Sequence, residues 1–105
     1  LIQSAIAEVA GNLAATSGMM LQVDALRQEG RMEMMHAAMA KATSTRLARS
    51  SAALARDALG GNGLLTEHEI AKIMGDVEAI YSYEGSYGMN TLIVGRALTG
   101  VSAFV

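Results

Sequence analysis

Residues 31–63 read RMEMMHAAMAKATSTRLARSSAALARDALGGNG. Apolar side chains recur at helical spacings from about Arg31 to Leu59, and alanine and serine occupy positions at which neighbouring helices approach closely. The glycines of residues 60–63 then stop the helix, because glycine readily adopts the left-handed backbone conformation found just past helix ends. This segment is therefore predicted to form the longest helix of the chain, closed by a sharp turn.

Helical patterns also flank this segment on both sides. We expect one helix over about residues 1–27 and two more over about 66–81 and 85–100. Thr66 followed by Glu69 has the capping-box spacing that opens a helix. Short links between long amphipathic helices favour antiparallel neighbours, so the sequence predicts an all-α fold, an antiparallel four-helix bundle.

The composition suits one helical domain. With 105 residues, 51% of them hydrophobic, the chain can build one core and has no room for a second. Proline is absent and aromatic content is only 4%, so the apolar residues are mostly aliphatic helix formers and methionine. We therefore treat residues 1–105 as a single domain.

Charge and cysteine content exclude several classes of function. Eight basic against ten acidic residues give a formal charge of -2, without the positive surface of nucleic-acid or anionic-membrane binders. The absence of cysteine excludes disulfides, thiolate metal sites and cysteine nucleophiles. Charged residues interrupt every apolar run before it reaches the length of about 20 residues that spans a bilayer, so no membrane span is expected.

Glu84 is the carboxylate with the most suggestive surroundings. Tyr83 and Gly85 flank it where the last helix should begin, and Tyr81 and Tyr87 are close in sequence. The aromatic rings could exclude water, and a buried carboxylate is a stronger base. A carboxylate near the amino end of a helix also simply stabilises the helix dipole. The residues by themselves leave both interpretations open.

A metal site is a weak alternative. Glu33 and His36 have the Glu-x-x-His spacing of di-iron helical bundles. Such a site needs a second copy of the motif, but the only other histidine, His68, follows Leu65 at the position where the motif requires glutamate. We therefore expect no metal ion.

Two features suit a phosphate-bearing ligand without identifying one. The backbone amides of residues 60–63 could approach a phosphate because glycine has no side chain in the way, although a plain helix stop explains the same run. The longest predicted helix is also basic, and its cations either attract a phosphate or solvate a helix face. These cations are Lys41, Arg46, Arg49 and Arg56.

Three motifs together resemble one known family. They are ARDALGGNG at 55–63, YEGS at 83–86 and GRALTG at 95–100. In this combination and spacing they are similar to the C-terminal domain of acyl-CoA dehydrogenases, above all the glutaryl-CoA dehydrogenase branch, which includes short-chain acyl-CoA oxidases. The resemblance implies that the family's N-terminal helical domain and middle β-domain are absent from this chain. The start at Leu1, without an initiator methionine, favours a piece of a longer protein.

The resemblance implies an FAD-dependent oxidoreductase that introduces an α,β double bond into an acyl-CoA thioester. Glu84 matches the base that removes the α-proton while a hydride passes to the flavin. Gly85 and Phe104 match substrate-binding positions, and Ser86 matches a contact to FAD. The positions that would contact the ADP part of an FAD held mainly by a neighbouring subunit are Asp57, Ala58, Leu59, Gly60 and Gly61.

The same resemblance implies partners and a location. It predicts a homodimer or homotetramer formed through the helical domain, an acyl-CoA substrate and, as one electron acceptor, an electron-transfer flavoprotein. A role in fatty acid or amino acid catabolism follows, in the bacterial cytoplasm or, in a eukaryote, the mitochondrial matrix. The isolated piece is expected to be inactive. The alternative is a freestanding helical module that kept the oligomer-forming surface and lost catalysis.

Three positions depart from the family's usual residues. Gly88 occupies a position where an acid or amide is usual, and Ser86 replaces the usual threonine. Gly75 replaces a larger residue and is expected to loosen the third helix, because glycine is a poor helix former.

Overall fold

The computed structural model describes residues 1–103, and these form helices and turns without a strand. The prediction of an all-α fold is confirmed. In chain order the elements are α1 (Ile2–Gln28), α2 (Met34–Ala58), the 3-10 helices η1 (Gly60–Leu64) and η2 (Thr66–His68), α3 (Ile70–Ser82) and α4 (Tyr87–Thr99). The prediction that the second helix is the longest is wrong, because α2 begins only at Met34 and has 25 residues, whereas α1 has 27.

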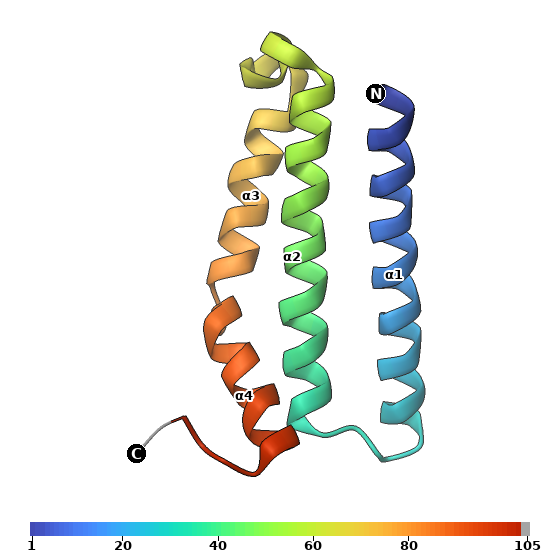
Figure 1. Ribbon diagram of the computed structural model, residues 1–105, viewed down its shortest axis with the longest axis vertical. Coiled ribbons are helices and arrows are strands. Elements are labelled where there is room, and N and C mark those ends of the chain that lie inside the picture. Colours follow the sequence, from blue (N-terminus) through green and yellow to red (C-terminus); the bar gives the residue numbers. More distant parts are fainter. Residues whose placement is uncertain (104–105) are drawn as a thin grey trace.

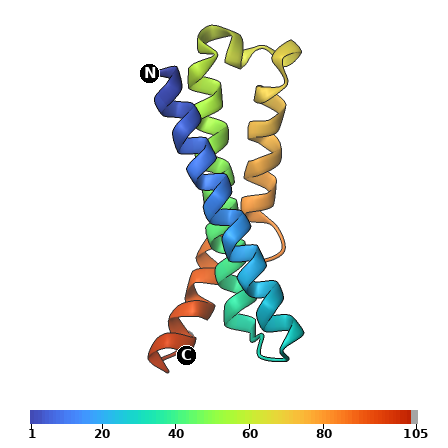
Figure 2. The ribbon, with the colours of Figure 1, turned by 90° about the vertical axis from the view of Figure 1, so that its right-hand side faces the viewer.

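Helix α2 is the centre of the fold, and it packs extensively against α1, α3 and α4. Figure 1 shows α1 antiparallel to α2 on one side, while α3 and α4 follow one another along the other side, both antiparallel to α2. Figure 2 shows α4 displaced from the line of α3 beyond the loop that joins them. The body measures 47 × 31 × 21 Å, so the bundle is elongated and flattened. The loop between α3 and α4 consequently lies part-way along the molecule and not at a tip.

Small residues of α2 allow this packing. The buried side chains of α2 are those of Ala38, Ala40, Ala42, Thr45 and Ala52. Alanine costs little entropy in a helix and lets a neighbouring backbone come close. Within residues 1–103 no large side chain is fully buried, so the core is thin.

Apolar side chains remain uncovered on α1. This helix has no buried residue, and Ile6, Leu13 and Leu21 are each more than half exposed. In the described part of the chain, no helix combines the length and the apolar character needed to cross a membrane. Several large apolar side chains exposed on one helix are typical of a surface that another part of a protein covers.

The amino end of α2 explains the Glu-x-x-His motif. The Glu33 side chain accepts a hydrogen bond from the backbone of the third helical residue, and the Glu33 N–H donates to Nδ1 of His36 at 2.9 Å. This reciprocal arrangement is a capping box, which satisfies backbone donors that a helix start leaves without partners. Residues 1–103 contain no group of three or more His, Asp or Glu side chains that could hold a metal ion.

The capping box expected at Thr66 and Glu69 is wrong. Residues 66–68 form the separate turn η2, and α3 begins only at Ile70. Glu69 has a φ of 63°, in the left-handed region, and no side chain caps the helix. A left-handed residue cannot be the third residue of a right-handed helix, so Thr66 cannot be the cap of α3.

The glycine turn after α2 folds back against the end of that helix. Gly60 follows α2 with a φ of 61°, which confirms the predicted helix stop. Gly63 is buried, and a Cβ atom added there would collide with the carbonyl oxygen of Arg56. Glycine is therefore required at position 63 by close approach and at position 60 by backbone conformation.

We expect Gly63→Ala to lower the free energy of unfolding by about 1–3 kcal/mol, because the methyl group would overlap the Arg56 carbonyl. Gly75→Ala is the matched control. Its new Cβ would meet nothing within 4 Å, so this change inside α3 should stabilise the protein by about 0.5–1 kcal/mol. Denaturant unfolding measures both values, and equal effects of the two substitutions would contradict the close approach.

Candidate functional site

The loop of residues 83–86 joins α3 to α4 and carries Glu84. Helix α3 ends at Ser82, and Ser86 is the N-cap of α4, where its Oγ accepts a hydrogen bond from the Met89 N–H at 3.2 Å. Glu84 is exposed in this chain. Its carboxylate therefore stands on a short non-helical segment held between two helix ends.

The backbone at Glu84 adopts an uncommon conformation. Glu84 has a φ of 55° and Gly85 a φ of 90°. Glycine accepts positive φ readily, whereas for another L-residue the left-handed conformation costs about 1–2 kcal/mol. Strained backbone of this kind persists where surrounding interactions enforce it, and it is common at functional sites.

The three tyrosines do not enclose Glu84 within this chain, contrary to the sequence-based expectation. Tyr81 and Tyr87 stack on each other, with ring centroids 5.2 Å apart. Tyr83 is 58% exposed. The rings pair with one another because offset stacking between aromatic rings is favourable. Any exclusion of water from Glu84 must therefore come from outside residues 1–103.

Two side chains that the sequence did not single out for this role hold the loop. The Lys41 ammonium on α2 donates to the carbonyl oxygens of Tyr83 and Gly85, the latter at 2.5 Å. Asn90, a buried residue of α4, donates from Nδ2 to the carbonyls of Gly85 at 2.8 Å and Ser86 at 3.0 Å. The loop is thus fixed from two helices.

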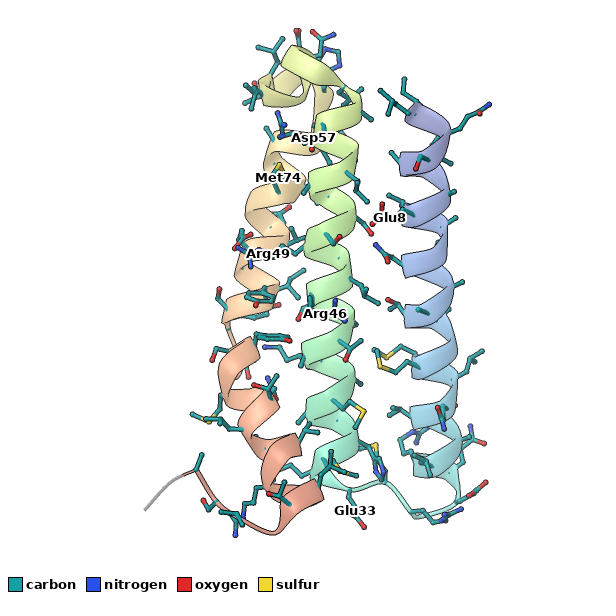
Figure 3. The ribbon with its side chains drawn as sticks, viewed as in Figure 1. Glu8, Glu33, Arg46, Arg49, Asp57 and Met74 are labelled. Atoms are coloured by element: carbon teal, nitrogen blue, oxygen red, sulfur yellow. The ribbon has the colours of Figure 1, made fainter. Side chains whose placement is uncertain are left out.

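Arg49 ties α2 to α3 just before the loop. Its Nε donates to Glu78 of α3 at 2.5 Å, and its guanidinium carbon lies 4.7 Å from the centroid of the Tyr81 ring. Figure 3 shows Arg49 beside α3. The hydrogen bond to Glu78 raises the pKa of the Arg49 guanidinium above its ordinary value, so the cation persists at all ordinary pH values. Arg49 and Lys41 therefore bind parts of their own chain, and a phosphate is not needed to explain them.

The residues expected to contact ADP lie together, away from Glu84. Asp57, Ala58 and Leu59 stand at the end of α2, and Gly60 and Gly61 follow in η1; all of them are exposed. Asp57, labelled in Figure 3, forms an ion pair with Arg56. Helix α3, with 13 residues, separates this group from the Glu84 loop by about 20 Å. The structure does not bring the two groups into one site.

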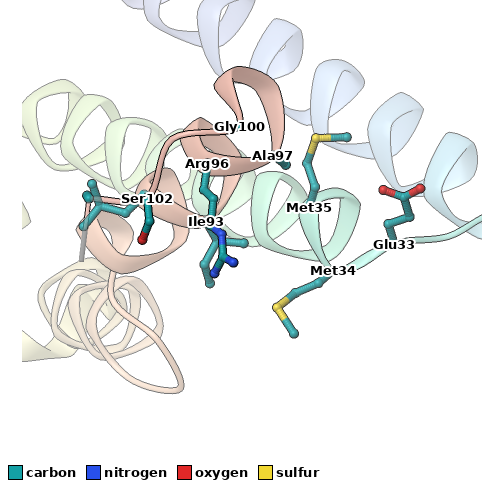
Figure 4. A pocket seen from close by; sticks show the side chains of 10 residues that line it. Glu33, Met34, Met35, Ile93, Arg96, Ala97, Gly100 and Ser102 are labelled. Carbon is teal, nitrogen blue, oxygen red and sulfur yellow. The ribbon is translucent and has the colours of Figure 1, made fainter. Parts of the chain in front are cut away.

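A separate pocket lies where the start of α2 meets the end of α4. It has a volume of about 370 Å³ and is lined by residues that include Met34, Met35, Ile93 and Arg96 (Figure 4). Glu84 is not part of it. Phe104, expected to line the acyl-CoA site, lies outside the described residues.

Comparison with protein families identifies the chain. Residues 1–99 match the family model described as acyl-CoA dehydrogenase, C-terminal domain. The chain belongs to the acyl-CoA dehydrogenase family. The first two motifs lie wholly within the match, and the third lies within it except for its last residue, Gly100.

A solved member of the family has the same fold. The crystal structure of glutaryl-CoA dehydrogenase from Mycobacterium smegmatis superimposes with a TM-score of 0.92 at 29% sequence identity. The match covers 98% of this chain and 27% of that enzyme's chain. This acyl-CoA dehydrogenase domain thus spans about a quarter of the length of the relative it matches.

Replacing Glu84 should reveal the backbone strain in this acyl-CoA dehydrogenase domain. Glu84→Gly is expected to raise the free energy of unfolding by about 1 kcal/mol, because glycine accepts the positive φ without a clash. Glu84→Val should lower it, because a β-branched residue tolerates that conformation least. Denaturant unfolding distinguishes them. A loss of stability in Glu84→Gly would show that the conformation is not strained.

Proposed function

We propose that this chain is the C-terminal helical domain of a complete FAD-dependent acyl-CoA dehydrogenase, and that Glu84 is its catalytic base. The observation that carries the proposal is an accessible carboxylate on a loop with fixed, strained backbone, in a chain of this family. One of the Glu84 oxygens accepts the α-proton of an acyl-CoA thioester. FAD, when bound, accepts the hydride that leaves the β-carbon.

The exposure of Glu84 fits a base whose cleft is completed by other domains. A carboxylate in contact with water is a weak base, and removal of water strengthens it. The tyrosines of this chain do not supply that exclusion. The N-terminal helical and middle β-domains, which we infer to precede residue 1 in the complete enzyme, would cover the loop.

Residues next to Glu84 suit contacts with substrate and flavin. Gly85 has no side chain, so a thioester can approach its backbone closely. The Ser86 hydroxyl accepts the Met89 N–H and keeps its own hydrogen to donate to the flavin. Phe104 completes the proposed set at the acyl-CoA site. Gly88 leaves room at the first turn of α4, since a Cβ there would meet only the Ser86 hydroxyl, at 4.0 Å.

The exposed end of α2 suits the ADP part of FAD. Gly61 faces open space, because an added Cβ would meet nothing within 4 Å, so a phosphate can reach the backbone there. The Asp57 carboxylate and the backbone carbonyls of Ala58 and Leu59 are hydrogen-bond acceptors. They can therefore bind the amino and hydroxyl groups of adenosine, which are donors. Because about 20 Å separates this group from Glu84, the two groups would serve different active sites of an oligomer.

Exposed apolar side chains on α1 support the proposal that this domain forms a homodimer or homotetramer. We further propose an acyl-CoA substrate, an electron-transfer flavoprotein as one electron acceptor, and a place in fatty acid or amino acid catabolism. The bacterial cytoplasm is the proposed location, or the mitochondrial matrix in a eukaryote.

Glu84→Gln tests the base. In the complete protein loaded with FAD, this change should slow the bleaching of flavin absorbance by acyl-CoA about 100- to 10,000-fold, because the amide cannot accept the proton. Flavin content should be unchanged. Glu67→Gln, at an exposed glutamate of η2, is the control and should bleach at the unmodified rate. Full activity in Glu84→Gln would exclude the role, and no bleaching of the unmodified protein by any acyl-CoA would favour the non-catalytic module.

Gly61→Ala tests the ADP site. The substitution is sterically silent within the chain, so it should leave the unfolding temperature unchanged and lower FAD affinity about tenfold by blocking the phosphate. Gly75→Ala, equally open but on α3, should bind FAD normally. Fluorescence titration of the deflavinated protein measures both affinities. Equal affinities in the two variants would place the ADP part elsewhere.

A further inference from the structure

One lysine reaches both peptide groups around Glu84 from a distant part of the chain. Lys41 is half-buried on α2, and its ammonium donates to the carbonyls of Tyr83 and Gly85, residues 42 and 44 positions further along. The same ammonium lies 5.7 Å from the centroid of the Tyr83 ring. An ammonium has three hydrogens, and this one directs its charge at the residues immediately before and after Glu84.

The backbone between these carbonyls is the part of the loop that needs support. Positive φ values at Glu84 and Gly85 make a tight reversal, and a non-glycine residue keeps that unfavourable conformation only where its surroundings enforce it. Hydrogen bonds from a charged donor are about twice as strong as neutral ones. Asn90 adds neutral bonds from α4 to the Gly85 and Ser86 carbonyls. Of the two side chains that hold the loop backbone, Lys41 is thus the charged one.

We propose that Lys41 is a positioning residue for Glu84. By donating hydrogen bonds to the carbonyl oxygens of Tyr83 and Gly85, it fixes the loop backbone and with it the direction in which the Glu84 side chain points. The inference rests on the proposed function of Glu84 as a base. Lys41 itself transfers no proton and contacts no substrate.

A purely structural tie would have a different consequence. If Lys41 only fastened the loop to α2, its loss would lower stability and leave turnover intact in the folded protein. If it sets the direction of the base, its loss must slow the proton transfer, because a displacement of about 1 Å can cost about 100-fold in rate. Substrate binding, which depends on other residues, would be unchanged.

The chain contains two lysines, which makes a controlled experiment possible. Lys72 is exposed on α3 and pairs with Asp76 at 3.1 Å, away from the loop. In the complete FAD-loaded protein, Lys41→Met should lower kcat about 10- to 100-fold with KM and flavin content unchanged. Lys72→Met should leave kcat as it is. Lys41→Gln, which keeps a donor and loses the charge, should give an intermediate kcat and serves if the methionine variant does not fold.

The reactivity of the Lys41 amine reports its hydrogen bonds to the loop without any substrate. In the unmodified protein, a lysine acylating reagent followed by mass spectrometry should label Lys41 much more slowly than Lys72, because the Lys41 nitrogen is engaged. Equal labelling of the two lysines would overturn the inference. So would an unmodified kcat in Lys41→Met or, where that variant is unfolded, in Lys41→Gln.

The experiments separate the two possible failures. If Glu84→Gln is slow while Lys41→Met turns over normally, the positioning role is wrong and the base remains. If Glu84→Gln turns over normally, the base is wrong, and the labelling of Lys41 still reports whether the loop is held.

Discussion

The alanines of α2 allow one helix to pack against α1, α3 and α4, and the rest of the structure depends on this contact. Within residues 1–103 no large side chain is fully buried, so stability comes from close approach of backbones and not from a deep core. A thin core of this kind leaves apolar residues exposed on α1. The exposed apolar surface of α1 is therefore suited to contact with other protein surfaces. This agrees with the match of the domain to about a quarter of the length of glutaryl-CoA dehydrogenase.

The same helix organises the candidate site. Lys41 and Arg49 stand two turns apart on α2; the first holds the loop around Glu84, and the second holds Glu78 and Tyr81 just before it. The far end of α2 presents Asp57 and the glycine turn. One rigid element thus sets the position of two separate groups of residues, about 20 Å apart, without any contact between them.

Much of the fold could be predicted from sequence because its helices carry strong local signals. The spacing of apolar residues located all the α-helices of the described region, and Gly60 marked the end of α2 correctly. The start of α3 was missed because a capping-box pattern is local, whereas the left-handed turn at Glu69 belongs to a two-step connection through η1 and η2. The spacing of Glu33 and His36 suits either a metal site or a capping box, and the position of the pair at the start of α2 makes it a capping box.

The candidate site was harder to predict. Glu84 was found through its family motif, since its neighbours in sequence gave no physical preference for catalysis. Lys41 was named only as a cation that suits a phosphate, and Asn90 was not named, because the partners of both are backbone carbonyls, which every residue has. The placement of α3 and α4 end to end has one more consequence. The reversal at residues 29–33 joins α1 to α2 at an end of the molecule remote from Glu84, so the contact between Lys41 and the loop does not depend on the length of that reversal.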